Sequence, residues 1–252
     1  MEYMNNIENK LTSIDETNIK YFDLFEFPEL FYGNLNFTTE KLCISKFPKE
    51  ILEEMKEWGE LIHTGINYYN DASCGNRLRF ITSSSRIVFK VQLKRKWPFQ
   101  KIVNWGSMGF DVYILENEKY IHKTIFAPMD GYNIFAEEIY IKPNEMLCIF
   151  LPNYNIIEKM YVGIQEGSTL SKFDYPKDNQ LPIIFYGNSI TQGAAASKTG
   201  NSFPNIVSRK LNRDIINISS SSGCLGTESI ANLIGKLNCH SIVIDYTKML
   251  LI

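Results

Sequence analysis

One serine follows a short apolar run in a pattern suited to acyl transfer. Residues 183–186 are continuously apolar, and Gly187, Asn188 and Ser189 come directly after them. Gly187 permits a sharp exit from a strand, which would display the Ser189 hydroxyl above a sheet edge, at the start of a helical turn whose amides lack intrahelical partners. A hydroxyl and free amides facing one pocket are the components of serine acyl transfer. A polar turn that only caps a helix explains these residues equally well.

The wider segment resembles the first conserved block of the SGNH, or GDSL-type, serine hydrolases. Residues 186–203 read YGNSITQGAAASKTGNSF and are similar, without gaps, to the branch of that family in which a β-sandwich precedes the hydrolase domain. The resemblance implies that Ser189 is the nucleophile and that its own amide helps to bind the oxyanion. It also implies a set of neighbours beside the site, namely Gly187, Asn188, Thr191, Gln192 and Gly193.

A second block follows the next apolar run. Residues 216–223 read INISSSSG and resemble the second block of the family, which is usually N-L-G-x-S-G. The resemblance implies that the amide of Gly223 is a further oxyanion donor. Because Ser219 stands where the family usually has glycine and a run of serines follows, Ser222 and Gly223 both remain open for this role.

The third block is incomplete. Residues 244–246 resemble the end of the third strand, but the following TKMLLI contains no asparagine, and no D-x-x-H segment, which carries the family's catalytic Asp and His, occurs in the 252 residues. His240 precedes that strand, so it should lie at the opposite sheet edge from Ser189, roughly 17 Å away across five residues. We therefore expect a C-terminally truncated chain with an incomplete triad: a truncated reading frame, a pseudogene-like product or one part of a split enzyme.

Two styles of sequence indicate two structural parts. After an N-terminal extension over residues 1–19, short apolar or alternating runs separated by turn residues predict an antiparallel, jelly-roll-like β-sandwich over residues 20–172. A charged segment at 51–58 is typical of a helix. The runs at 77–81 and 86–93 predict two strands joined by a tight polar turn.

Beyond a polar linker, continuous apolar strands alternate with amphipathic helices over residues 181–252. This β-α-β-α-β order predicts a partial flavodoxin-like, three-layer α/β domain with three parallel strands in the order 2-1-3. The third strand would form an uncovered edge. We therefore expect self-association or a complementing C-terminal fragment at that edge.

Composition narrows the classes of partner. The 26 basic and 28 acidic residues give a net charge of −2, which argues against nucleic-acid binding. The N-terminus lacks a signal-peptide pattern and no apolar run reaches 18 residues, so we expect a cytoplasmic protein without a membrane partner. A glycine-rich phosphate loop and a metal-binding spacing are absent, which predicts no cofactor and no metal.

The cysteines are odd in number and widely spaced in the sequence. This pattern predicts reduced thiols at Cys43, Cys74, Cys148, Cys224 and Cys239.

The resemblance implies an ester hydrolase that acts on small esters, with acetyl esters of carbohydrates as the expected substrates. Because the triad is incomplete, we expect this chain alone to be inactive or weak, and whether it is an enzyme stays open. The alternatives are a non-catalytic carbohydrate- or partner-binding protein and one half of a split esterase.

Overall fold

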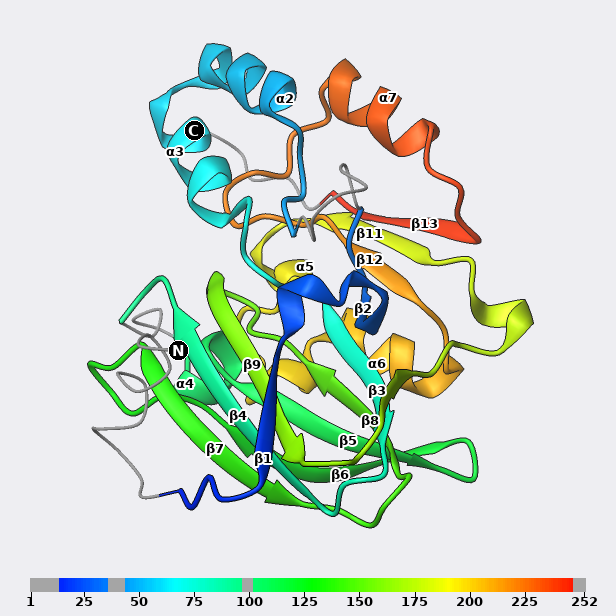
Figure 1. Ribbon diagram of the computed structural model, residues 1–252. Coiled ribbons are helices and arrows are strands. Elements are labelled where there is room, and N and C mark those ends of the chain that lie inside the picture. The colour runs from blue at the N-terminus through cyan, green and yellow to red at the C-terminus, as the bar shows by residue number, and fades with distance from the viewer. Residues whose placement is uncertain (1–13, 36–43, 97–101, 247–252) are drawn as a thin grey trace.

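The computed structural model describes residues 14–35, 44–96 and 102–246, which form an antiparallel β-sandwich and a smaller α/β part (Figure 1). The strands of the sandwich are β1 (Ile19–Asp23), β2 (Phe31–Tyr32), β3 (Arg77–Thr82), β4 (Arg86–Leu93), β5 (Phe110–Glu116), β6 (Lys119–Phe126), β7 (Ile134–Tyr140), β8 (Met146–Phe150), β9 (Ile157–Gln165) and β10 (Leu170–Lys172). The strands of the α/β part are β11 (Ile183–Gly187), β12 (Ile215–Asn217) and β13 (Ser241–Asp245). The α-helices are α2 (Lys49–Glu54), α3 (Glu60–Tyr69), α4 (Asn104–Ser107), α5 (Ser189–Gln192), α6 (Phe203–Leu211) and α7 (Glu228–Gly235). The 3₁₀ turns are η1 (Leu24–Glu26), η2 (Pro28–Leu30), η3 (Met55–Trp58), η4 (Lys177–Asn179) and η5 (Thr199–Asn201).

Two antiparallel sheets form the sandwich, which confirms the fold predicted from the spacing of the apolar runs. One sheet has the order β1-β9-β4-β7, and the other has β10-β3-β8-β5-β6 with β2 paired to β3. The predicted strands at 77–81 and 86–93 are β3 and β4, but they lie in different sheets. The turn between them therefore carries the chain across the sandwich, because each strand must present its apolar face to the core from its own side.

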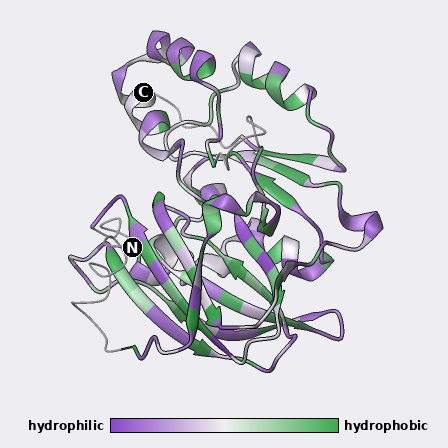
Figure 2. Cartoon of the chain, in the orientation of Figure 1, coloured by the Kyte–Doolittle hydropathy of each residue, from purple (hydrophilic) through white to green (hydrophobic). Residues whose placement is uncertain are grey.

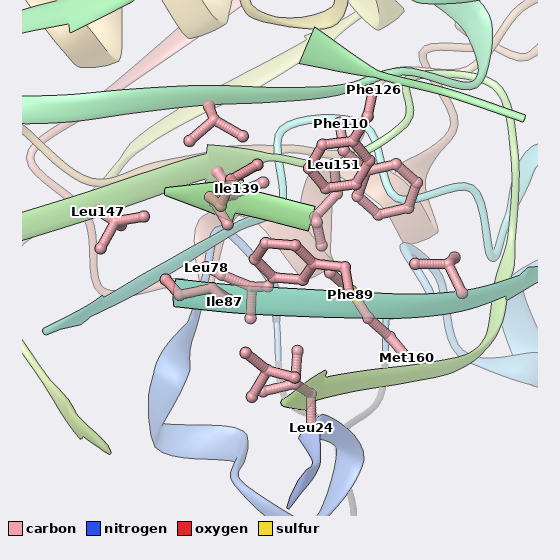
Figure 3. Packing of buried hydrophobic residues seen from close by; sticks show 14 of the residues in the cluster. Leu24, Leu78, Ile87, Phe89, Phe110, Phe126, Ile139, Leu147, Leu151 and Met160 are labelled. Carbon is pink, nitrogen blue, oxygen red and sulfur yellow. The ribbon is translucent and has the colours of Figure 1, made fainter. Parts of the chain in front are cut away.

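Alternating side chains fill the space between the two sheets. On β5, Phe110 and Val112 are fully buried and belong to the same core as Phe89 of β4 and Phe126 of β6. The rings of Phe110 and Phe126 stack with centroids 5.2 Å apart, and the ring of Phe89 lies 5.2 Å from that of Phe126 (Figure 3). Aromatic side chains bury large apolar areas, so this stack anchors the sandwich.

The parallel sheet has β11 at its centre. It pairs in parallel with β12 on one side and with β13 on the other, which confirms the predicted order 2-1-3. All five residues of β11 are buried, and the strand is coloured hydrophobic along most of its length (Figure 2). A continuous apolar run of this kind is typical of a strand covered on both faces.

Helices cover the two faces of the parallel sheet (Figure 1). On one face, Phe203 of α6 packs edge-on against Phe185, with ring centroids 5.7 Å apart. On the other face, Ile184 and Tyr186 share a core with α7 and with Met55 and Ile66, which precede β3 in the chain. The segment containing α2 and α3 thus belongs by packing to the α/β sheet, although strands of the sandwich flank it in the sequence.

The outer face of the second sandwich sheet is charged and lies against the α/β part. Arg77 and Arg79 alternate with apolar residues on β3 and are both fully buried. Arg77 forms an ion pair with Asp214, which precedes β12. The guanidinium of Arg79 lies 3.6 Å from the ring centroid of Tyr175. Ion pairing and stacking allow these charges to be buried between the two parts.

Candidate active site

The turn after β11 presents Ser189 at the edge of the parallel sheet. Asn188 is the N-cap of α5, and its side-chain oxygen accepts a hydrogen bond from the amide of Ile190 at 2.8 Å. Ser189 is the first residue of α5 and is partly exposed. Its hydroxyl forms no hydrogen bond with another residue that the structure describes. An unengaged hydroxyl at the carboxyl end of the central strand suits a nucleophile.

Two glycines determine the shape of this turn. A Cβ atom on Gly187 would collide with the side chain of Thr191. Gly193 ends α5 with a φ of 119°, and a Cβ atom there would lie 2.5 Å from Asn153 Nδ2. The left-handed backbone and the close approach of Asn153 both require glycine at this second position.

Thr191 and Gln192 support the turn and are fully buried. Thr191 Oγ1 donates a hydrogen bond to Asp245 Oδ2 at 2.8 Å, at the end of β13. Gln192 Oε1 accepts a hydrogen bond from the Ser221 amide at 2.7 Å, and its Nε2 donates to the carbonyl of Asn153 at 3.1 Å. These contacts connect the nucleophile turn to β13, to the loop after β12 and to the sandwich.

The amides of Ser222 and Gly223, the two candidates for a second oxyanion donor, differ in their hydrogen bonding. The amides of Ser189 and Ser222 donate no hydrogen bond within the described part of the chain. Ser222 has a φ of 61°, in the left-handed region that favours glycine. The Gly223 amide instead donates to the Ser220 carbonyl at 3.0 Å, and a Cβ atom at Gly223 would collide with Ile66 of α3. This geometry favours the Ser222 amide, and it explains the glycine at 223 by packing.

Two thiols near these loops are poor nucleophiles. Cys74 is fully buried with its Sγ 3.6 Å from the carbonyl of Asn217, and burial raises the pKa of its thiol. Burial and the charge of Asp245 raise the pKa of Cys224 to about 11. Because the thiolate is the reactive form, these shifts lower the reactivity of both thiols at neutral pH. The described cysteines are all unpaired thiols, and Cys43 lies outside the described residues.

The histidines with described side chains form no hydrogen bond with Ser189. His240 precedes β13, whose far end pairs with the end of β11, so it lies at the opposite edge of the sheet from Ser189. His122 Nε2 lies 2.9 Å from Asp111 Oδ1 in the sandwich. Nothing is described of the His63 side chain. A general base for Ser189 is therefore not found among the side chains that the structure describes.

A buried carboxylate, whose role is not evident from the sequence, joins the sandwich to the segment after α5. Asp111 of β5 is fully buried. Besides the contact with His122, its carboxylate accepts hydrogen bonds from three groups. They are the Tyr113 hydroxyl at 3.0 Å, the Lys198 ammonium at 3.1 Å and the Gly200 amide at 3.0 Å. The available signal was an aspartate placed within an apolar strand, in the sequence GFDVY of residues 109–113.

Neither a metal site nor a membrane span is found in the ranges that the structure describes. No three His, Cys, Asp or Glu side chains gather there to hold a metal ion. No helix in those ranges has the length and apolar character needed to cross a bilayer. The absence of a cofactor and the cytoplasmic location stay predictions.

Two protein-family models match the chain. Residues 180–248 match the GDSL-like lipase/acylhydrolase family. Residues 36–170, more than half of the chain, match the N-terminus of the SGNH-hydrolase-type esterases. The name of this second model is the motif GxDLY, which residues 109–113 match with valine in place of leucine. A search of curated proteins by sequence finds no match.

Solved structures share this fold. A Bacteroides ovatus protein assigned as a GDSL-like lipase has 20% identity and a TM-score of 0.73, with 90% of this chain and 64% of that chain covered. A salicylyl-acyltransferase of a tetracycline biosynthetic pathway has 16% identity and a TM-score of 0.60, with 92% and 60% covered. The chain thus spans less than two thirds of either protein. A family two carbohydrate esterase from Cellvibrio japonicus, at 16% identity and 58% and 43% coverage, has a TM-score of only 0.40 and supports no conclusion.

Proposed function

The chain belongs to the SGNH-hydrolase-type esterases, and from that premise we propose that Ser189 accepts an acyl group from an ester. One observation carries the proposal. The unengaged Ser189 hydroxyl stands at the carboxyl end of β11, and the loops around it contain two unengaged amides, those of Ser189 and Ser222. A nucleophile and oxyanion donors are what acyl transfer needs from a backbone turn.

In the proposed reaction, Ser189 Oγ attacks the ester carbonyl carbon while its proton passes to a general base. The amides of Ser189 and Ser222 stabilise the negative charge that develops on the carbonyl oxygen. The alcohol leaves with a proton returned by the base, and water then releases the acid from Ser189. Losing one oxyanion donor costs about a hundredfold to a thousandfold in kcat in such enzymes.

We further propose that the chain alone turns over esters slowly. The described side chains supply no imidazole to Ser189, because His122 and His240 are held elsewhere. Serine hydrolases without their base retain only the faint catalysis that comes from binding and the oxyanion donors. A further polypeptide segment that carries a histidine, oriented by a carboxylate, would complete the site.

Small esters are the proposed substrates, with acetyl esters of carbohydrates as the first candidates. Ser189 is partly exposed, and the adjacent Ile190 is 55% exposed. An open rim of this kind leaves room for a large alcohol on the ester. The likeness to a salicylyl-acyltransferase makes an acceptor alcohol other than water a second candidate.

The test uses p-nitrophenyl acetate hydrolysis and covalent labelling by a fluorophosphonate probe. We expect slow hydrolysis and slow labelling, both lost in Ser189→Ala and both retained in the control Ser168→Ala on the sandwich. Labelling that persists in Ser189→Ala would exclude this nucleophile. Fast hydrolysis by the chain alone would contradict the proposal that this chain lacks a general base for Ser189. Calorimetric titration with oligosaccharides tests the non-catalytic alternative, which requires binding that Ser189→Ala leaves intact.

The exposed edge of β13 supports a second proposal, that a strand from a partner pairs with it. Among the described strands, β13 pairs only with β11. Ile242, Val243 and Ile244 are 42%, 38% and 60% exposed. Because successive residues of a strand point to opposite faces, β13 exposes apolar side chains on both faces. We propose that a complementing segment adds a strand here, with a second copy of this chain as the alternative.

Co-expression with any polypeptide encoded directly downstream that carries a D-x-x-H segment tests this partner. We expect a stable complex with faster ester hydrolysis, lost in Ile244→Lys, since a lysine at the edge blocks strand pairing. The control Ile121→Lys, at an exposed position of β6, should leave the complex intact. A dimer of the chain alone by light scattering, abolished by Ile244→Lys, would instead identify self-association.

A further inference from the structure

A tyrosine from the sandwich reaches the candidate active site. Tyr154 lies in the loop between β8 and β9 and is buried. Its hydroxyl oxygen lies 3.0 Å from the Ser189 carbonyl oxygen and 2.9 Å from Ser221 Oγ. Because a phenol has one proton, it donates to the carbonyl and accepts from the Ser221 hydroxyl. Burial raises the pKa of Tyr154, so the phenol keeps this proton at neutral pH.

Contacts outside the site fix the position of Tyr154. Its ring packs edge-on against Tyr69 of α3, with centroids 5.3 Å apart and planes at 88°. Its amide donates to the Ser107 carbonyl at 3.0 Å, and its carbonyl accepts from Arg95 Nη1 at 2.8 Å. Three separate segments thus hold this residue, one by its ring and two by its backbone, and none of them belongs to the turn around α5.

The two groups that Tyr154 binds adjoin the two unengaged amides. The Ser189 carbonyl also accepts the amides of Gly193 and Ala194, at 3.1 and 2.8 Å, which closes the turn around α5. Ser221 directly precedes Ser222, so its conformation sets the direction of the Ser222 amide. Tyr154 therefore connects the Ser189 backbone to the side chain of Ser221, the residue before the second donor.

We propose that Tyr154 is a positioning residue that sets the spacing between the Ser189 and Ser222 amides. The inference rests on the proposed function, in which these amides bind the oxyanion. It gives the sandwich a part in the chemistry, through one hydroxyl that is held by the sandwich and by α3. Misplacing reacting groups by about 1 Å costs on the order of a hundredfold in rate, so a single hydrogen-bonded spacer can matter.

Hydrogen exchange measured by mass spectrometry on the full chain tests the connection without needing activity. In Tyr154→Phe, which keeps the ring, we expect exchange about tenfold faster over both 189–194 and 218–225, with β4 and β9 unchanged. Ser221→Ala should loosen only 218–225. Ser220→Ala is the matched control, because the buried Ser220 hydroxyl has no hydrogen-bond partner among the described residues. We expect this variant to leave the exchange rates of both loops unchanged.

Two exchange results would overturn the proposal. One is unchanged exchange over both loops in Tyr154→Phe. The other is an equal increase in every strand, because that pattern indicates loss of overall stability. A connection made through Tyr154 requires a local change in both loops.

Kinetics on p-nitrophenyl acetate supply the second readout. We expect Tyr154→Phe to lower kcat by about tenfold to a hundredfold with KM within about twofold, because the donors act in the transition state. Looser loops with an unchanged kcat would overturn the positioning role. Turnover that survives Ser189→Ala would instead overturn the proposed function, and the exchange result would still decide whether Tyr154 connects the loops.

Discussion

Lys198 Nζ lies 3.1 Å from Asp111 Oδ1, a contact that joins the segment after α5 to strand β5 of the sandwich. Asp111 is inaccessible to water, and the Lys198 side chain is only 20% exposed. Asp111 lies on the motif-bearing strand of the N-terminal family match. We therefore interpret residues 109–113 as the anchor of the loop that follows α5.

Replacing this carboxylate should destabilise the whole chain. Asp111→Asn keeps the shape but leaves the Lys198 ammonium without its counter-charge, which should cost about 2–4 kcal/mol in the free energy of unfolding. Urea unfolding measures the loss. Asp178→Asn, at an exposed position of η4, is the control and should stay within about 0.5 kcal/mol. Equal unfolding midpoints for the two variants would contradict this role of Asp111.

Gly200 should not tolerate a methyl group. A Cβ atom there would collide with Asp111 Oδ2, so Gly200→Ala should cost about 1–3 kcal/mol. Gly235, at the end of α7, has no atom within 4 Å of such a Cβ, and Gly235→Ala should be neutral or stabilising by up to about 1 kcal/mol. Thermal unfolding distinguishes the two. Similar melting temperatures would show that the loop moves aside without cost.

Arg79 should not be replaceable by lysine. Its guanidinium is stacked on the ring of Tyr175 and donates to the Phe173 carbonyl at 3.3 Å and to the Tyr120 hydroxyl. An ammonium lacks the planar face that stacks on a ring and the fork that reaches widely separated acceptors, so Arg79→Lys should cost about 2 kcal/mol or more. Arg86→Lys, at the more accessible ion pair with Glu138, should cost less than about 1 kcal/mol. Chemical unfolding of both variants provides the comparison.

The Cys224 thiol should react slowly at ordinary pH. With its pKa raised to about 11, only about 0.1% of it is thiolate at pH 8, whereas a free cysteine of pKa about 8.5 is roughly a quarter ionised. Iodoacetamide should therefore modify Cys224 at least about a hundredfold more slowly than it modifies glutathione. The rate should rise about tenfold per pH unit toward pH 11, and peptide mass spectrometry follows it. Rapid modification at pH 8 would reopen Cys224 as a nucleophile.

The raised pKa of Cys224 also makes the free energy of unfolding decrease at alkaline pH. The pKa of folded Cys224 lies above that of the unfolded thiol, so the folded chain binds this proton more tightly. The contribution is fully present below the unfolded pKa, near 8.5, and is lost as the pH rises through about 11. Cys224→Ser should flatten this alkaline loss in a series of unfolding curves.

Local patterns predicted the first strand of the α/β part and the turn that follows it. The continuous apolar run of β11 and the Gly187 to Ser189 sequence depend only on neighbouring residues, and both are confirmed as a central strand and a tight turn. The roles of Ser189 as nucleophile and of its amide stay predictions. The turn at 83–85 was visible, but its crossing between sheets was not, since a hairpin and a crossover use the same polar residues.

Contacts between distant segments could not be predicted from a single sequence. Tyr154 is one of 14 tyrosines, and nothing near it in the chain indicates that its hydroxyl meets Ser189 and Ser221. The choice between Ser222 and Gly223 depends on a backbone dihedral angle and on Ile66 of α3. These features arise only once the sandwich and the helices before it have packed.

The position of α2 and α3 on the parallel sheet has a consequence for how the chain is made. Both helices leave the ribosome long before β11, the strand that they cover, has been synthesised. Segments usually fold as they emerge, starting from the N-terminus. Here the helices lack the strand that they cover until β11 has been made, so neither part could be excised and grafted elsewhere as a self-sufficient module.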